Sequence, residues 1–453
     1  MELFGTAGVR GDVRDRVTPA AALAVGRAAA QHARETGSDE TPVFAVGRDG
    51  RETGTALADT VASGLQSGGA RVVRLGPVPT PALAYAAQGR RGIMVTASHN
   101  PPTDNGLKLF VDGEEYDREA ERAVETRVEA NERPVPWDQF GDAERADVLA
   151  DYRDAVAEYA RGIGADPDGL RVAVDCGTGM ASVATPAVLR ALGADVVALN
   201  AQVDGHFPAR GSKPTADSLS ELRAFVRDGD AAFGIGHDGD ADRIVVVDGD
   251  GEVVHEDTVL AVLAERFVRE AVTADPVVVT TPNASARIDE RVRAAGGRVE
   301  RVRLGALHEG IAAARGDAET GVAFAAEPWK HIHPAFGPWI DGVASAAVLT
   351  RLVAESGLDG LRDPVTERPY RKVSVPCPDD EKERVMAALT ERLPAAFPDG
   401  EVDTEYGVRV ERPDASWVLV RPSGTEPYVR IYAEAEDVDA LVDRARETVE
   451  AEL

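Results

Sequence analysis

One short segment of the chain places a hydroxyl group beside an imidazole. Residues 96–102 read Thr-Ala-Ser-His-Asn-Pro-Pro and continue an apolar run that begins at Gly92 and is typical of a buried strand. Ser98 therefore lies in a loop at the end of a strand, where a side chain is well presented. A serine hydroxyl can act as an activated nucleophile or carry a phosphoryl group as a donor. A capped turn explains the same residues, so Ser98 needs partners elsewhere in the chain. No Gly-x-Ser-x-Gly motif is centred on it, which argues against a serine hydrolase.

Three carboxylates at alternate positions form a second candidate centre. The segment contains Asp238, Asp240 and Asp242, ends at Arg243 and has apolar runs on both sides. Side chains two positions apart project to one side of an extended or looped backbone, and hard oxygen ligands in threes suit Mg²⁺. The segment is not an EF-hand, because Arg243 and Gly249 stand where that loop needs glycine and glutamate. An acidic surface turn is the alternative, and the apolar flanks disfavour it.

A third cluster, near the end of the chain, gathers groups that bind oxyanions. Residues 421–427 read Arg-Pro-Ser-Gly-Thr-Glu-Pro, and a further arginine follows. The cluster provides two guanidinium groups, two hydroxyls and a flexible glycine: Arg421, Arg430, Ser423, Thr425 and Gly424. Such groups suit a phosphate dianion, which arginine binds in bidentate fashion. Turn hydrogen bonds would explain the hydroxyls but not the two arginines. Together, the three motifs indicate phosphoryl transfer on a phosphorylated small molecule.

The elements that must position these groups repeat three times. Each repeat is a short apolar strand, a helix followed by glycine and a second strand: residues 43–46, 55–66 and 72–73; 172–174, 184–192 and 196–197; 277–279, 286–295 and 299. Units of this length predict α/β domains with parallel pairing. The first helix of the chain is predicted from Pro19 to about Arg34. The last segment differs, with strands predicted at 417–421 and 428–433 and a helix at 438–450. We therefore predict three similar α/β domains with mixed sheets, followed by a smaller α+β domain.

Composition limits the partners. The chain has 453 residues with 78 acidic and 50 basic side chains, a net charge of −28. This charge repels nucleic acid and acidic membranes, so we expect neither as a partner. No apolar run approaches the ~18 residues of a membrane span, no secretory signal is visible, and two cysteines imply no disulfide framework. We therefore expect a cytoplasmic protein. Abundant acidic residues with few lysines are also typical of adaptation to high salt.

Taken together, the motifs resemble the α-D-phosphohexomutase superfamily, which includes phosphoglucomutase, phosphomannomutase and phosphoglucosamine mutase. The likeness spans essentially the whole chain, with the motifs in family order, and is that of an archaeal, halophilic member. It implies that Ser98 is the phosphorylated residue, with His99 and Arg243 beside its phosphate. It also implies Mg²⁺ as the cofactor, held by Ser98 and the three aspartates, and an active site in the central cleft between the domains.

Further roles follow only from this resemblance. Residues 5–11, Gly-Thr-Ala-Gly-Val-Arg-Gly, resemble the family's N-terminal loop, which makes Arg10 a phosphate-positioning residue. Lys108, in Asn-Gly-Leu-Lys, corresponds to the candidate general acid/base. Residues 421–427 resemble the phosphate-binding loop of the last domain. The implied domains are 1–150 with the phosphoserine loop, 151–253 with the metal loop, 254–365 with a sugar-binding loop, and 366–453 with the phosphate-binding loop.

The sugar-binding loop departs from the family pattern Gly-Glu-x-Ser-Gly-His. Residues 326–331 read Ala-Glu-Pro-Trp-Lys-His, so Glu327 and His331 match, whereas Trp329 and Lys330 replace serine and glycine. Glu327 is expected to bridge two sugar hydroxyls, and His331 to contact the sugar and assist proton transfer. Trp329 could instead pack against the neighbouring Trp339. The departure leaves catalysis intact but makes the preferred sugar an open question.

The resemblance implies reversible interconversion of hexose 1-phosphate and 6-phosphate through a phosphoserine enzyme and a bisphosphorylated sugar. The segment Leu3-Phe-Gly-Thr and the chain length favour phosphoglucosamine mutase; a phosphomannomutase/phosphoglucomutase of broad specificity is the alternative. A phosphatase or sugar kinase could use the same groups, although no P-loop motif supports a kinase. A non-catalytic sugar-phosphate sensor is the candidate from another class. The expected partners are the sugar phosphate and a bisphosphate activator, and the expected assembly is a monomer or homodimer.

Overall fold

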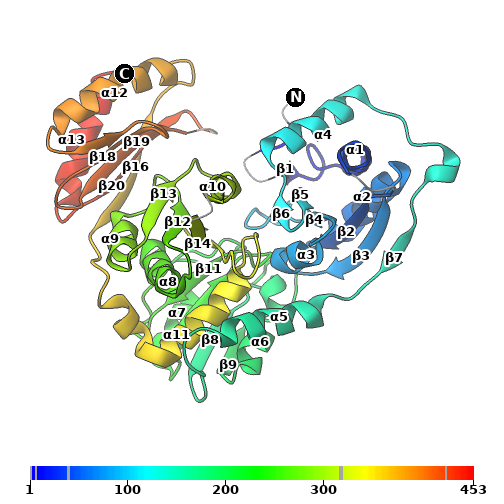
Figure 1. Ribbon diagram of the computed structural model, residues 1–453, viewed down its shortest axis with the longest axis horizontal. Coiled ribbons are helices and arrows are strands. Elements are labelled where there is room, and N and C mark those ends of the chain that lie inside the picture. Colours follow the sequence, from blue (N-terminus) through cyan, green and yellow to red (C-terminus); the bar gives the residue numbers. More distant parts are fainter. Residues whose placement is uncertain (1–2, 6–7, 38–40, 316–319, 424–425) are drawn as a thin grey trace. The chain divides into compact units, whose positions relative to one another are not determined.

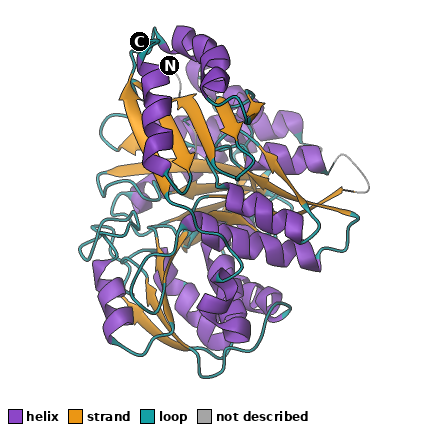
Figure 2. Cartoon of the chain, turned by 90° about the vertical axis from the view of Figure 1, so that its left-hand side faces the viewer, coloured by secondary structure: helices purple, strands orange, loops and turns teal. Residues whose placement is uncertain are grey.

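The computed structural model describes residues 3–5, 8–37, 41–315, 320–423 and 426–453. The chain forms two compact units, the first made of Met1–Glu256 and Trp329–Leu361, the second of Asp257–Pro328 and Arg362–Leu453. Figure 2 shows that helices flank the sheets throughout the chain. The fold class predicted from the sequence is confirmed. The chain forms α/β domains with mixed sheets, and its C-terminal segment forms an antiparallel sheet. The four-domain division stays a prediction.

The first sheet contains the loop that carries Ser98. Its strand order is β1-β5-β4-β2-β3-β7, and β6 pairs with β5. The strands are β1 (Val9–Asp12), β2 (Val43–Arg48), β3 (Arg71–Pro77), β4 (Arg91–Val95), β5 (Asp104–Val111), β6 (Glu114–Glu115) and β7 (Ala143–Arg145). β2 pairs in parallel with β3, as predicted, and with β4. β5 runs antiparallel to both β4 and β1, so the strand of Lys108 lies beside the strands that lead to Ser98 and carry Arg10.

Helices cover both faces of this sheet. α1 (Pro19–Thr36), α2 (Gly54–Ser67) and α4 (Arg118–Ala130) pack against the face that carries Phe44, Val46 and Ile93. The shorter α3 (Thr80–Ala86) lies on the other face, as Figure 1 shows. α1 starts where the sequence predicts, because the Thr18 side chain accepts a hydrogen bond from the backbone N–H of Ala21 and Pro19 follows at the first turn.

The second sheet carries the aspartate loop. Its order is β11-β10-β8-β9, formed by β8 (Arg171–Asp175), β9 (Asp195–Leu199), β10 (Phe233–His237) and β11 (Ile244–Val247). β8 and β9 are parallel, as predicted, whereas β11 returns antiparallel to β10. Asp238, Asp240 and Asp242 therefore lie in a tight connection between two buried strands. The segment from Asp248 to Glu252 is a hairpin turn, closed by a 2.8 Å hydrogen bond from the Asp248 N–H to the Glu252 carbonyl.

Several helices and short segments complete the first unit. They are η1 (Trp137–Gln139), α5 (Leu149–Arg161), η2 (Met180–Val183), α6 (Thr185–Ala191), α7 (Ser220–Asp228), β15 (Lys330–Ile332) and α11 (Gly342–Arg362). Trp329 packs against the hydrophobic cluster that contains Leu219 and Val245, whereas Trp339 contacts the rings of Tyr85 and Phe336. The two tryptophans thus belong to different clusters.

The second unit contains the third predicted repeat and the C-terminal domain. β12 (Asp275–Thr280) pairs in parallel with β13 (Arg298–Arg301) and β14 (Thr320–Glu327), beside α8 (Glu256–Glu270), α9 (Ala286–Ala294) and α10 (Leu307–Ala314). The C-terminal sheet has the order β16-β20-β19-β18-β17: β16 (Tyr370–Pro376), β17 (Glu401–Asp403), β18 (Val408–Glu411), β19 (Trp417–Pro422) and β20 (Tyr428–Glu434). α12 (Lys382–Ala396) and α13 (Val438–Glu450) cover one face. β19, β20 and α13 agree closely with the sequence prediction.

A buried ion pair joins the two parts of the second unit. The guanidinium of Arg287, on α9, lies 2.9 Å from the carboxylate of Glu434, on β20, and both side chains are at most 1% exposed. The indole N–H of Trp417 donates to the same carboxylate at 2.9 Å. Removing either charge would leave the other buried without compensation, which is strongly destabilising. This pair therefore holds the C-terminal sheet against α9.

No helix in the described ranges combines the length and apolar character that crossing a bilayer requires.

The net charge of −28 predicts that salt stabilises the fold. We expect the thermal unfolding temperature to rise from low to molar KCl, because counterions screen the repulsion among acidic side chains. Differential scanning calorimetry over a KCl series measures this, with sucrose at equal osmolality as the control. An unfolding temperature that stays constant or falls in molar KCl would contradict the expectation.

Candidate active site

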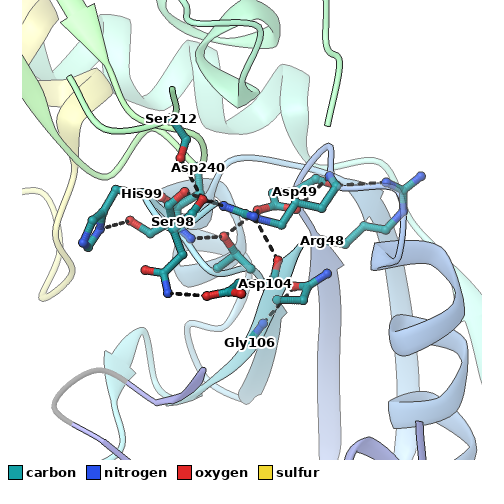
Figure 3. Close-up of polar contacts among 12 residues, drawn as sticks. Arg48, Asp49, Ser98, His99, Asp104, Gly106, Ser212 and Asp240 are labelled. Carbon is teal, nitrogen blue, oxygen red and sulfur yellow. Dashed lines mark hydrogen bonds and ion pairs between the residues drawn. The ribbon is translucent and has the colours of Figure 1, made fainter. Parts of the chain in front are cut away.

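Ser98 occupies a strained position at the end of β4. Its φ of +51° lies in the left-handed region that non-glycine residues rarely adopt. The Oγ atom donates a 2.7 Å hydrogen bond to Asp238 Oδ2 and lies 3.3 Å from His99 Nδ1. Figure 3 shows this loop with its polar contacts. The structure thus brings the serine loop onto the aspartate loop, 140 residues away in sequence.

The aspartate loop is compact and buried. Oxygen atoms from Asp238, Asp240 and Asp242 all lie within 4.8 Å of one another, and each residue is at most 1% exposed. Gly239 permits the close approach to the serine loop, because a Cβ there would lie only 2.7 Å from the Ser98 carbonyl oxygen. The alternate spacing of the aspartates therefore brings their three carboxylates together, as expected from the sequence.

The environment separates the pKa values of these carboxyls. Burial, together with the nearby Asp242 and Asp240, raises the pKa of Asp238 well above 3.8. Burial alone would also raise the pKa of Asp242, but the charges of Lys108 and Arg243 outweigh it and hold that pKa below 3.8. Mutual repulsion within the group is thus only partly balanced by protein cations.

Cations line this group of carboxylates. The Lys108 ammonium, 2% exposed on β5, lies 2.7 Å from Asp242 Oδ2 and 3.5 Å from Asp240 Oδ2. Burial would lower its pKa, but the two aspartates and Glu115 raise it above 10.5. Arg243 Nε lies 3.7 Å from both Asp238 and Asp242. Burial, then Arg243 and Arg10, lower the pKa of His99 to about 3, so its imidazole is neutral at physiological pH.

The residues present fit a divalent cation. Asp240 Oδ1 and Asp242 Oδ1 are buried, and neither has a hydrogen-bond partner among the described residues. Leaving a buried carboxylate oxygen unsatisfied is costly, whereas a hard cation would satisfy it. The donor set, carboxylate oxygens beside a serine hydroxyl, is the kind that hard divalent cations select.

Thr80 is a site residue that the sequence did not reveal. Its hydroxyl donates to Asp240 Oδ2 at 2.6 Å, and its backbone N–H donates to the Asp240 carbonyl at 3.0 Å. This leaves Asp240 Oδ1 as the oxygen for which the described part of the chain provides no donor. Groups that orient metal-binding carboxylates in this way commonly matter for metal affinity. The only local signal was the rigid sequence Pro79-Thr80-Pro81, in which Thr80 is the first residue of α3.

The sugar-loop residues lie in two different surroundings. Glu327 ends β14 in the second unit and accepts a hydrogen bond from the Gly305 N–H. His331, in the first unit, is 2% exposed, and its Nδ1 lies 3.1 Å from Ser345 Oγ. Burial lowers the pKa of His331 to about 3. Trp329 has a φ of +69°, and Lys330 forms a backbone bridge with Arg243, the arginine of the aspartate loop.

The C-terminal cluster has a basic, hydroxyl-lined character. Arg421 and Arg430 face each other across β19 and β20, so their side chains leave the same face. The Ser423 hydroxyl is buried without a hydrogen-bond partner among the residues described. The Lys382 ammonium, which the sequence did not reveal, donates to the carbonyls of Ser423 and Glu426 at 2.7 and 2.6 Å. The predicted residues Gly424 and Thr425 lie outside the described residues.

Comparisons with known proteins agree with this geometry. Residues 1–134, 150–251 and 373–451 match the family models described as phosphoglucomutase/phosphomannomutase α/β/α domain I, α/β/α domain II and C-terminal domain. A phosphopentomutase of Thermococcus kodakarensis is 40% identical, covering 99% of this chain and 98% of its own. A probable phosphoglucosamine mutase of Methanopyrus kandleri is also 40% identical, with the same coverage. Among solved structures, a phosphoglucomutase/phosphomannomutase family protein from Burkholderia thailandensis is similar, with a TM-score of 0.87, 27% identity and coverage of 99% and 97%.

Proposed function

The chain belongs to the phosphoglucomutase/phosphomannomutase family of phosphohexomutases, and from this premise we propose that it moves phosphate between two hydroxyls of one sugar through Ser98. The observation that carries the proposal is the 2.7 Å contact between Ser98 Oγ and Asp238, inside a buried group of carboxylates and cations. A phosphoryl group on Oγ would enter the region where a cation and the guanidinium of Arg243 can balance its charge.

The proposed transfer is balanced in atoms and charge. The free hydroxyl oxygen of the sugar phosphate bonds to phosphorus as the bond from phosphorus to Ser98 Oγ breaks. The proton of that hydroxyl ends on Oγ, which leaves free serine and a sugar bisphosphate. The reverse step at the other phosphate regenerates phosphoserine and releases the isomer. We assign the proton relay to Lys108, a role usually worth ~10²–10⁴ in rate. Arg10 and Arg243 stabilise the charge, and neutral His99 contacts Oγ.

We propose Mg²⁺ as the cation, held by Asp238, Asp240, Asp242 and Ser98. When bound, it offsets negative charge on the transferring phosphoryl group, which is the main catalytic demand of such reactions. The cluster around Arg421, Ser423 and Arg430 would hold the phosphate that is not reacting, with Lys382 fixing its loop. One fixed phosphate site and one reacting serine require the bisphosphate to turn over between the two transfers.

We propose glucosamine phosphate as the preferred substrate. Relatives that align with nearly the full chain at up to 40% identity are named as probable phosphoglucosamine mutases. A pentose phosphate is the second candidate, because the equally similar Thermococcus kodakarensis relative is named a phosphopentomutase. The substitutions at Trp329 and Lys330 change the segment expected to contact the sugar, and this supports testing both glucosamine phosphate and a pentose phosphate as substrates.

A mutase assay with Mg²⁺ in molar KCl, primed with glucose 1,6-bisphosphate, separates these candidates. We expect glucosamine phosphate to give the highest kcat/KM, compared with glucose, mannose and ribose phosphates. Preference for ribose phosphate would make the protein a phosphopentomutase, and equal use of glucose and mannose phosphates a broad hexose mutase. Phosphate release without isomerisation would indicate a phosphatase. No turnover of any sugar by folded protein phosphorylated at Ser98 would indicate a sensor.

A further inference from the structure

A buried arginine lies beneath the loop that carries Ser98. Arg51 is 1% exposed, and all five of its guanidinium N–H donors have acceptors. Nε donates to Asp49 Oδ2 at 3.1 Å; Nη1 donates to the carbonyls of Pro101 and Asp104 at 2.5 and 2.9 Å; Nη2 donates to those of Ser98 and Asn100 at 2.9 and 2.8 Å. One side chain thus ties together four carbonyls of a seven-residue segment.

The partner carboxylate holds the other side of the Ser98 backbone. Asp49 Oδ2 accepts a 2.7 Å hydrogen bond from the Thr96 hydroxyl, and Thr96 Oγ1 in turn accepts the Ser98 backbone N–H at 2.9 Å. The N–H of Ser98 is therefore linked to Asp49 through Thr96, while the carbonyl of Ser98 is bound directly by Arg51. Figure 3 shows polar contacts in this region, where Asp49, Ser98 and Asp104 lie close together.

These contacts account for the unusual backbone at Ser98. A φ of +51° is unfavourable for serine and persists only where surrounding groups fix the peptide on both sides. In this conformation Oγ reaches Asp238 Oδ2. A relaxed backbone would keep the serine but redirect its hydroxyl.

The segment between β9 and α7 also supports the serine loop. The Phe207 ring covers the Arg51 guanidinium, with the central carbon 5.1 Å from the ring centre. Gly205 lets this segment approach, because a Cβ there would lie 2.6 Å from the Arg51 Cα. The Ser212 hydroxyl donates to the Asn100 carbonyl at 2.9 Å. These contacts give the sequence Gly205-His-Phe-Pro208 a physical role that its residue types alone did not indicate.

We propose that Arg51, with Asp49, is a positioning residue for phosphoryl transfer: it fixes the backbone of Ser98 so that Oγ faces the aspartate loop. The inference rests on the proposed function, since it assigns what orients the phosphorylated serine. Arg51 touches neither substrate nor the reacting atoms, and its effect passes through the Ser98 peptide.

Arg51→Lys tests this proposal, with Arg351→Lys as the matched control. Lysine keeps the charge but lacks the rigid five-donor fork. Arg351, on α11, is also buried. Its guanidinium donates to the backbone carbonyl of Ile163 and to the carboxylate of Asp166. We expect Arg51→Lys to lower kcat by about a hundredfold with KM changed less than about threefold, because misplacing a reacting group costs rate rather than binding. Arg351→Lys should stay within about twofold of the parent, although both variants lose stability.

A second pair of variants removes one hydroxyl instead of a guanidinium. Thr96→Val deletes the link between Asp49 and the Ser98 N–H at nearly constant volume and should lower kcat by about tenfold. Thr96→Ser retains the hydroxyl and should recover most of that loss. This pair keeps the test decisive if Arg51→Lys does not fold.

Intact-mass measurement of Ser98 phosphorylation by glucose 1,6-bisphosphate separates failure of this inference from failure of the proposed function. Slower phosphorylation of Arg51→Lys than of the parent supports the inference, even if no sugar is isomerised. If Ser98 is phosphorylated at the same rate in the parent, in Arg51→Lys and in Thr96→Val, the positioning role of Arg51 is overturned but the proposed function is not. A parent protein that never accepts phosphate on Ser98 overturns the proposed function and this inference together.

Discussion

Replacing Ser98 with alanine is expected to reduce mutase turnover at least ~10²-fold, because it removes the atom that carries the phosphoryl group. The hydroxyl makes the 2.7 Å contact with Asp238 and lies 3.3 Å from His99. Binding should change far less than rate, since the proposed phosphate-binding cluster around Arg421 is untouched. A coupled assay of sugar isomerisation gives kcat and KM, and mass spectrometry checks that the variant no longer takes up phosphate from the bisphosphate.

Ser67→Ala is the matched control for this variant. Ser67 is a buried serine of α2 whose hydroxyl donates to the Gly64 carbonyl at 2.8 Å. The same hydroxyl accepts a 3.2 Å hydrogen bond from Arg27 Nε. Loss of the two hydrogen bonds costs about 1–3 kcal/mol of stability and should leave kcat within about twofold. Near-normal turnover in Ser98→Ala, or an equal loss in Ser67→Ala, would rule out Ser98 as the phosphate carrier.

Asp240→Asn should abolish the stabilisation that Mg²⁺ gives to the parent protein and reduce turnover at least ~10²-fold. At a Mg²⁺ concentration of about one hundred times Kd, binding stabilises the folded state by about 2.7 kcal/mol, which appears as a higher unfolding temperature. Without metal two effects of the neutral amide oppose each other. It relieves the repulsion by which Asp240 helps to raise the pKa of Asp238, and it removes an attraction to the Lys108 ammonium 3.5 Å away. The metal-free variant should therefore unfold within a few degrees of the metal-free parent.

Thermal unfolding with EDTA and with Mg²⁺ measures both effects. Asp250→Asn is the control, because Asp250 is an exposed acid in the hairpin turn after β11. It should keep the full Mg²⁺ response. A Mg²⁺-dependent rise in Asp240→Asn as large as in the parent would show that the cation binds elsewhere.

The local elements and the chemical groups can be predicted from the amino-acid sequence. The strand–helix–strand repeats are visible because β-branched runs and glycine stops are short-range signals, and the parallel pairs β2·β3, β8·β9 and β12·β13 follow from them. The serine, aspartate and arginine motifs are likewise contiguous in sequence. The sequence predicted that the sheets are mixed, but not that β5 lies antiparallel between β4 and β1. Strand order and register depend on contacts between distant strands.

The way in which these groups are held depends on the folded chain. Thr80 orients Asp240 from 160 residues away, and Arg51 binds the serine loop from 47 residues before Ser98. Lys382 binds the C-terminal loop from 41 residues before Ser423. Each is an ordinary residue in sequence and gains its role from hydrogen bonds that form only when separate segments pack together. Burial acts in the same way: it lowers the pKa of His331 and, with neighbouring charges, moves the pKa values of Asp238 and Asp242 in opposite directions. Motifs can be identified along the chain because covalent spacing fixes them, whereas support, strain and charge depend on neighbours that only the folded chain supplies.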